Sequence, residues 1–182
     1  MNFFRRYWQI AAIAIVIIAL DQWTKSLVRA SIPLGGSWLP AGWEWLSPYA
    51  RIVHWYNTGA AFGMFQQGSM VFTVLAFVVI GLILYYYPQV EKADWSLRIA
   101  MSMQLGGAAG NLIDRLTIGH VTDFISLGNF PVFNVADASI TVGAVVLFLG
   151  IWMMEIAERK NKKDASAQES PPGEKPSEIT SE

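Results

Sequence analysis

The sequence predicts an all-α membrane protein with four transmembrane helices and a small extracytoplasmic region at the membrane interface, a Trp-rich loop region that contains β-structure. Of the 182 residues, 53% are hydrophobic and only 15% are charged. A soluble domain usually carries about 25% charged residues, so lipid rather than water should surround much of the surface. The apolar residues are also gathered into long segments separated by polar ones. Residues 1–157 are therefore expected to form one membrane domain.

A helix needs roughly 20 residues to cross a hydrocarbon layer about 30 Å thick. The first candidate span is interrupted by Asp21 and Lys25, and the third is short and contains Gln104 and Asn111. The third also carries Gly106 and Gly110, a spacing that is typical of close helix packing. The four segments that meet or approach the required length are 7–28, 68–87, 97–113 and 138–157.

The first segment has one competing interpretation, a cleaved signal peptide. Arg5 and Arg6 before an apolar run are typical of such peptides. However, the run leads into Asp21-Gln22-Trp23-Thr24-Lys25 and not into a clear cleavage site with small residues. A retained span is therefore favoured.

Basic residues predict the orientation, because loops rich in Lys and Arg stay in the cytoplasm. With four spans, the basic residues fall on one side of the membrane, so both termini should be cytoplasmic and the loops 29–67 and 114–137 should face outward. These residues are Arg5 and Arg6 before the first span, Lys92 and Arg98 between the second and third, and Arg159, Lys160, Lys162 and Lys163 after the fourth.

The outer loop 29–67 is unusual in its four tryptophans: Trp38, Trp43, Trp45 and Trp55. Within it, Arg51–Tyr56 could be a short strand. Such a segment is expected in the headgroup layer, either as an anchor or as a platform for a membrane-embedded substrate. At the other end of the chain, residues 158–182 are predicted to be a disordered cytoplasmic tail, because Ser, Pro, Glu and Lys dominate its later part.

Composition also excludes several classes of function. The absence of cysteine excludes a disulfide scaffold, thiolate metal sites and a cysteine nucleophile. His54 and His120 are far apart and not in HExxH spacing, so we expect neither a zinc peptidase nor any other metal site, and no cofactor. The formal net charge of -1 offers no basic field for nucleic acid.

Charges at membrane depth are costly, so each needs an explanation. Asp21 and Lys25 are four residues apart on one helical face, which predicts an ion pair near the outer boundary or support for a nearby site. Asp114 and Arg115 end the third span. They could simply terminate the helix, or Arg115 could hold a carbonyl or carboxylate through its forked donors.

Asp123 and Asp137 each have an ordinary explanation, as a loop charge and as a helix N-cap respectively. They lie in the loop between the third and fourth spans, however, where neighbouring helix ends can bring them together. Two carboxylates in contact share a proton, and the start of a helix favours charge on Asp137. One acid and one base can then coexist, as hydrolysis of a peptide by an activated water requires.

A set of motifs, read in order, adds specificity. On a chain with four spans they resemble the bacterial lipoprotein signal peptidase (type II signal peptidase) family over about residues 7 to 157. The motifs are Asp21-Gln22-Trp23-Thr24-Lys25, Asn57-Thr58-Gly59-Ala60-Ala61-Phe62-Gly63, Gly110-Asn111-Leu112-Ile113-Asp114-Arg115, Val121-Thr122-Asp123-Phe124 and Phe133-Asn134-Val135-Ala136-Asp137.

The resemblance implies an aspartyl endopeptidase, a hydrolase of the bacterial cytoplasmic (inner) membrane that acts at its outer face. Its substrates would be diacylglyceryl-modified prolipoproteins, from which it would remove signal peptides, and membrane lipids and globomycin-like inhibitors would also bind. Asp123 and Asp137 would be the catalytic pair. The residues expected to line or support the site are Asn57, Asn111, Arg115 and Asn134, together with Asp114, Asp21 and Lys25.

Two other classes of function compete with this interpretation. A small ion-coupled transporter also uses membrane carboxylates, but it predicts charges near the bilayer midplane and broken helices there. In this sequence the charges gather at predicted outer ends of spans. A structural membrane subunit would leave the paired aspartates and the Asn and Arg residues without a role.

Overall fold

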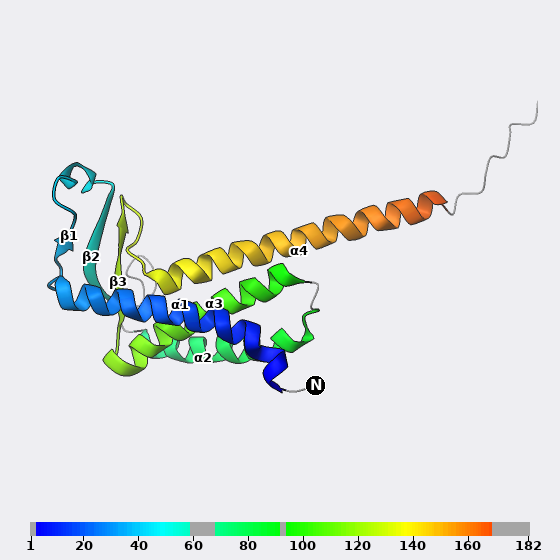
Figure 1. The fold of residues 1–182 in the computed structure, drawn as a ribbon, viewed down its shortest axis with the longest axis horizontal. Helices are drawn as coiled ribbons and strands as arrows, with labels where there is room; N and C mark the ends of the chain where they lie inside the picture. The colour runs from blue at the N-terminus through cyan, green and yellow to red at the C-terminus, as the bar shows by residue number, and fades with distance from the viewer. Residues whose placement is uncertain (1–2, 59–67, 92–93, 169–182) are drawn as a thin grey trace, which may run out of the picture.

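The computed structural model describes residues 3–58, 68–91 and 94–168, and this part of the chain is mostly helical (Figure 1). Three of its helices are long and apolar enough to cross a membrane, over Tyr7–Ser31, Ser69–Gln89 and Val135–Lys160. These correspond to the first, second and fourth predicted spans. The helices are α1 (Phe3–Ser31), α2 (Ser69–Tyr86), α3 (Trp95–Ile118) and α4 (Val135–Gln168), with short 3-10 turns at Glu44–Leu46 (η1) and Tyr87–Gln89 (η3).

Helix α3, which contains the predicted third span 97–113, lies in the middle of the bundle and packs against α1, α2 and α4. Glycines allow this close approach: a Cβ added to Gly106 would lie 2.9 Å from Ile17 Cβ, and one added to Gly110 would lie 2.7 Å from Asp21 Oδ2. The two glycines of the predicted packing motif therefore serve contacts within the chain. Because other helices surround α3, it tolerates more polar and small residues than a helix facing lipid.

Three antiparallel strands form a small sheet in the order β1 (Ser37–Trp38), β2 (Ala50–Asn57) and β3 (Val121–Leu127). Strand β2 confirms the predicted strand at Arg51–Tyr56. Strand β3 was expected to be loop. The sequence pattern did not indicate this strand, because Thr122 and Asp123 are buried beside Val121 and Phe124. Hydrophobic and polar residues therefore do not alternate as they do in a half-exposed strand.

Helix α4 extends past both ends of the predicted span 138–157 (Figure 1). It begins at Val135 and continues to Gln168, through residues 158–168, where disorder was predicted. This corrects the predicted start of the tail. Good helix formers such as Glu, Arg, Lys and Ala fill this stretch, and Glu155 pairs with Arg159 one turn away at 2.6 Å. The rest of the predicted tail, 169–182, lies outside the described residues.

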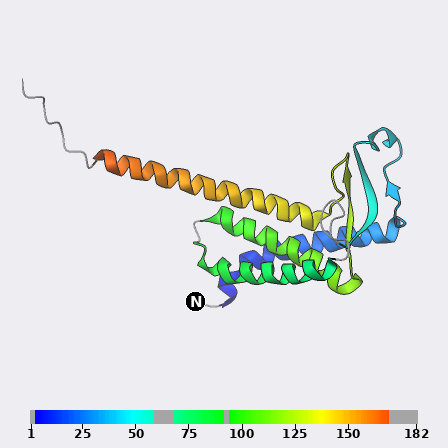
Figure 2. The ribbon, with the colours of Figure 1, turned by 180° about the vertical axis from the view of Figure 1, so that it is seen from behind.

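The sheet lies at one end of the helix bundle. In both views it covers the C-terminal part of α1 and the beginning of α4, while the orange end of α4 projects beyond the opposite end of the bundle (Figure 1, Figure 2). The chain segments that hold the candidate site residues therefore converge where the sheet meets the helices.

Candidate active site

Asp123 lies in β3 with both carboxylate oxygens occupied and its side chain buried, at 2% exposure. Asn57, at the end of the paired strand β2, donates from Nδ2 to Asp123 Oδ2 at 2.8 Å. Asn134, just before α4, donates from Nδ2 to Asp123 Oδ1 at 2.7 Å. The antiparallel pairing of β2 and β3 therefore brings two of the motifs together.

Asp137 lies in the first turn of α4, so it is not the N-cap that was the ordinary alternative explanation for its position. Asn134 is the capping residue: its Oδ1 accepts from the Asp137 N–H at 2.9 Å. Asp137 Oδ2 in turn accepts from the Asn134 N–H at 3.3 Å, so the two residues form a reciprocal capping box. Asn111 on α3 donates from Nδ2 to Asp137 Oδ1 at 2.7 Å.

Asn134 thus contacts both carboxyl groups, because its Nδ2 donates to Asp123 Oδ1 and its backbone N–H donates to Asp137 Oδ2. Burial, followed by the negative charge of Asp137, raises the pKa of Asp123 to about 7. Hydrogen bonds from Asn57 and Asn134 and the charge of Lys25 oppose this rise. The Asp123 carboxyl can therefore gain or lose a proton near neutral pH.

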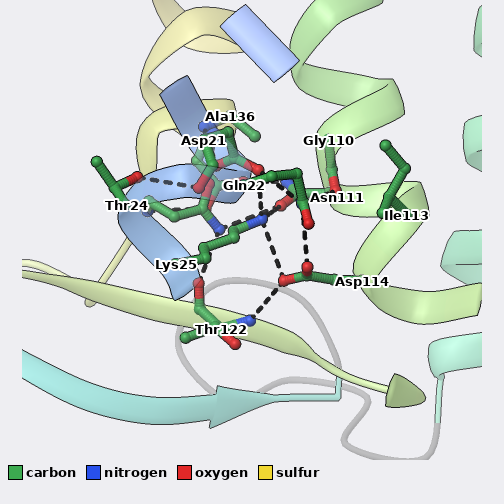
Figure 3. Close-up of polar contacts among 12 residues, drawn as sticks. Asp21, Gln22, Thr24, Lys25, Gly110, Asn111, Ile113, Asp114, Thr122 and Ala136 are labelled. Atoms are coloured by element: carbon green, nitrogen blue, oxygen red, sulfur yellow. Dashed lines mark hydrogen bonds and ion pairs between the residues drawn. The ribbon is translucent and has the colours of Figure 1, made fainter. Parts of the chain in front are cut away.

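Lys25 supports this arrangement from a fully buried position on α1 (Figure 3). Its ammonium group contacts Asp21 Oδ2 at 2.8 Å and Asp114 Oδ2 at 3.2 Å and donates to Asn111 Oδ1 at 2.9 Å. The predicted Asp21–Lys25 ion pair is confirmed, and it is part of a larger buried cluster.

The same carboxylates also hold the backbone of the two site segments (Figure 3). Asp21 Oδ1 accepts from the Ala136 N–H at 2.9 Å, and Asp114 Oδ2 accepts from the Thr122 N–H at 3.0 Å. Each of these amides immediately precedes one of the candidate catalytic aspartates. Asp21 and Asp114 therefore fix the positions of Asp137 and Asp123 relative to α1 and α3.

Three members of this cluster were not predicted as site residues. Gln22 donates from Nε2 to the Gly110 carbonyl and to Asp114 Oδ1, both at 3.1 Å, and Arg29 donates to Thr122 Oγ1 at 3.0 Å. The sequence carried a signal for Arg29, which lies one turn beyond Lys25 on the same helical face. Thr122 and Gln22 lie within two of the motifs, but an uncharged side chain beside charged ones gives no separate signal in the sequence.

A cavity of about 560 Å³ adjoins the pair. Its polar lining comes from Asn57, Asn111, Arg115, Asp137 and Thr141. Much of the remainder is apolar, with Phe72 of α2 and Ile140 of α4 among its walls. Asp123 is not among the lining residues, but its partner Asn57 is.

Arg115 is the site residue with the least support from neighbouring side chains. Its Nε is buried without a hydrogen-bond partner in the described part of the chain. The guanidinium carbon lies 5.6 Å from the centre of the Phe72 ring, and its charge interacts with Asp137, Asp123 and Asp114. It can therefore offer donors to a bound molecule.

Part of the predicted motif set cannot be placed, because residues 59–63 lie outside the described residues. Within residues 3–58, 68–91 and 94–168, no group of three or more His, Asp or Glu side chains is arranged to hold a metal ion.

Comparison with known proteins places this arrangement in a family. The family model described as signal peptidase (SPase) II matches residues 13–153. The chain belongs to the signal peptidase II family. Its relatives include the lipoprotein signal peptidase of Halalkalibacterium halodurans, 40% identical over 159 residues, or 85% of this chain and 97% of that protein. The lipoprotein signal peptidase of Shouchella clausii is 38% identical over 155 residues, or 83% of this chain and 97% of that protein.

Solved structures agree with this assignment of fold. A bacterial membrane enzyme determined by the in meso method superposes with a TM-score of 0.71 at 25% identity, over 90% of this chain and 93% of that one. A second bacterial membrane enzyme gives a TM-score of 0.68 at 27% identity, over 78% and 91% of the two chains. This signal peptidase II is therefore a multi-pass protease of the bacterial inner membrane that removes signal peptides from prolipoproteins.

Proposed function

We propose that this signal peptidase II is an aspartic endopeptidase in which Asp123 and Asp137 activate a water molecule. The observation that supports this proposal best is that one residue, Asn134, donates hydrogen bonds to both carboxyl groups, from its side chain to Asp123 and from its backbone N–H to Asp137, beside a cavity of about 560 Å³. Carboxyl groups that interact in this way share a proton near neutral pH, which is the state that peptide hydrolysis by water needs.

The mechanism follows from that shared proton. The ionised carboxylate takes a proton from water as the water oxygen attacks the scissile carbonyl carbon, and the protonated carboxyl donates a hydrogen bond to the carbonyl oxygen. The tetrahedral intermediate then collapses, the C–N bond breaks, and the leaving amine receives a proton from the pair. Asn57, Asn111 and Asn134 hold the two carboxyl groups in place, and Arg115 stabilises negative charge that develops on the substrate.

We further propose that the substrates are diacylglyceryl-modified prolipoproteins. The cavity beside Asp137 has apolar walls from α2, which bears Phe72, and from α4, which bears Ile140 and Val142. Acyl chains would be bound along these helices, where they meet membrane lipids, while the peptide reaches the carboxyl groups. Globomycin-like inhibitors would occupy the same cavity.

The proposed membrane topology has four spans, with α3 as the third, and both termini in the cytoplasm. Residues 1–157 would form the membrane domain, and the outer loops 29–67 and 114–137 would carry the sheet and the site at the outer face. Four exposed tryptophans support placing the sheet end at a membrane–water interface, because at least half of the surface of each is exposed and can lie in the headgroup layer. They are Trp38 at 56%, Trp43 at 53%, Trp45 at 69% and Trp55 at 50%.

The proposed substrate class is tested with the purified full-length protein in detergent. A diacylglyceryl-modified prolipoprotein and the same precursor without its lipid are incubated separately, and cleavage is followed on a gel. We expect cleavage of the lipidated precursor alone, and its inhibition by a globomycin-like compound. Equal cleavage of both precursors would contradict the proposed substrate class, and cleavage of neither would contradict the proposed function.

A further inference from the structure

Another cavity, of about 300 Å³, lies between α1 and α3 near the starts of both helices, at the end of the bundle opposite the sheet (Figure 2). Its lining residues lie within 8–13 of α1 and 95–102 of α3, together with Tyr87 of η3. None of them belongs to the candidate active site. This α1–α3 cavity therefore needs an explanation of its own.

Arg98 is the charged residue of the α1–α3 cavity, and its position favours a bound anion. It lies in the first turn of α3, where the positive end of the helix dipole disfavours a cation. Within the part of the chain that the structure describes, Arg98 forms no ion pair with a carboxylate. The acidic residues nearest to it in the sequence, Glu91 and Asp94, line a different cavity, between α2, α3 and α4.

The guanidinium group of Arg98 is held in place by three contacts. Its Nε donates to Gln9 Oε1 at 3.3 Å, its Nη1 donates to the Val90 carbonyl at 3.1 Å, and its central carbon lies 4.3 Å from the centre of the Tyr87 ring. Nη2 makes no hydrogen bond with the described residues. Because the group is already positioned, its remaining donors can bind a ligand at a low entropic cost.

The rim of the cavity has the character of a membrane surface. Trp8 of α1 and Trp95 of α3 both line the cavity and are both exposed. Tryptophan is enriched at the membrane–water interface, where its ring contacts acyl chains and its N–H donates to polar groups. Arg5 and Arg6 precede Trp8 in α1, which adds basic residues to this end of the helix.

The side of the cavity that faces the membrane interior is apolar. Ala12 and Ile13 lie about one turn after Trp8 on α1, and Ile99 lies one turn after Trp95 on α3. Both helices run from this end of the bundle toward the sheet (Figure 1), so these residues lie deeper than the rim. A cation near the surface with apolar side chains beneath it matches a phospholipid, which has its phosphate at the surface and its acyl chains inside.

We propose that the α1–α3 cavity binds an anionic phospholipid of the surrounding leaflet. Its phosphate accepts hydrogen bonds from Arg98, and an acyl chain lies along Ala12, Ile13 and Ile99. Basic pockets between membrane helices bind anionic headgroups in this way, and hydrogen bonds between ionised groups are stronger than neutral ones. The lipid connects α1 to α3, the helices that carry Lys25 and Asn111 at their other ends. The inference goes beyond the proposed function, since this lipid is not a substrate.

The test uses the purified full-length protein in detergent, freed of bound lipid. Phosphatidylglycerol or phosphatidylcholine is added, binding is measured by native mass spectrometry, and thermal unfolding is followed in parallel. Both lipids carry a phosphate, but only phosphatidylglycerol has a net negative charge. We expect it to bind more tightly and to raise the unfolding temperature more. Equal effects of the two lipids, or the same rise with inorganic phosphate alone, would overturn the proposal. Neither readout depends on cleavage.

The Arg98→Gln variant tests whether binding occurs at this cavity. Glutamine retains hydrogen-bonding groups but removes the charge, so the affinity for phosphatidylglycerol should fall about fivefold, as expected when one basic residue near an anionic headgroup is lost. The matched control is Arg159→Gln, which removes an exposed cation of α4 that pairs with Glu155. Its affinity should not change. An equal fall in both variants would indicate general attraction to basic residues and would overturn the site.

A second variant keeps Arg98 intact and tests the place of the acyl chain. Ala12 is exposed and lines the apolar side of the cavity, so Ala12→Phe should fill that side without disturbing the packing of the helices. We expect weaker binding of phosphatidylglycerol and a smaller rise in unfolding temperature. Unchanged binding by Ala12→Phe would contradict the proposed position of the lipid, even if Arg98→Gln does not fold.

Discussion

At the residue scale, the central feature is a carboxyl group that titrates in the working range of the enzyme. Asp123 is held by two asparagine amides and buried beside Asp137. Because the pair needs one proton for catalysis, activity should fall as the pH rises through the pKa of Asp123, which is about 7. The stability of the fold should change in the same direction. Because folding raises the pKa of this carboxyl group, its protonated form stabilises the folded state at low pH, and this contribution is lost as the pH rises through 7.

The Asn57→Ala variant tests that titration. The hydrogen bond from Asn57 lowers the pKa of Asp123, so its removal should move the basic limb of the kcat/KM profile to higher pH, and activity should persist further into the alkaline range. Gln89→Ala serves as the control, because Gln89 donates to the Tyr85 carbonyl in the α2–η3 segment, away from the pair. A basic limb that stays in place in Asn57→Ala would argue against Asp123 as the group that loses the proton.

At the scale of elements, the sequence predicted the helices better than it predicted how their ends are built. Long apolar runs located α1, α2 and α4, and the β-branched and aromatic residues of 51–56 located β2. Strand β3 was missed because Thr122 and Asp123 are buried by polar contacts that come from distant elements. For the same reason, Asp137 could not be distinguished from an N-cap without knowing that Asn134 already fills that position.

The close approach of α1 to α3 gives a prediction about stability. A Cβ on Gly110 would lie 2.7 Å from Asp21 Oδ2, so Gly110→Ala should displace the Asp21 carboxylate and destabilise the protein by about 1–3 kcal/mol. Gly81→Ala on α2 is the matched control, because a Cβ there meets nothing within 4 Å. Thermal unfolding in detergent compares the two. Equal unfolding temperatures for the Gly110 and Gly81 variants would show that this contact does not limit the packing.

At the scale of the whole molecule, the proposed orientation places the sheet outside the cell and the end of α4 inside. The chain contains no cysteine, so single cysteines can report on each side. Glu44→Cys, at an exposed position in η1, should react with a membrane-impermeant maleimide in intact spheroplasts. Glu158→Cys, at an exposed position on α4, should react only after permeabilisation. The opposite pattern would invert the topology and place the site at the inner face.

Contacts between distant segments of the chain explain why the arrangement of the two aspartates could not be predicted from the sequence alone. Its two carboxyl groups come from β3 and α4, and their supports come from α1, α3 and β2. Motif order indicated that these segments belong together, but no local pattern could show that Lys25, Asn111 and Asn134 form one continuous chain of contacts to both aspartates.

The proposed catalytic pair is tested most directly by the rate at which Asp123→Asn and Asp137→Asn cleave a lipidated prolipoprotein, each compared with Asp94→Asn near the opposite end of α3. All three variants should unfold cooperatively, so that a loss of activity cannot be attributed to loss of the fold. We expect both site variants to lose activity by a factor of about 10³ or more and Asp94→Asn to retain it. Full cleavage by either Asp123→Asn or Asp137→Asn would contradict the proposed catalytic pair.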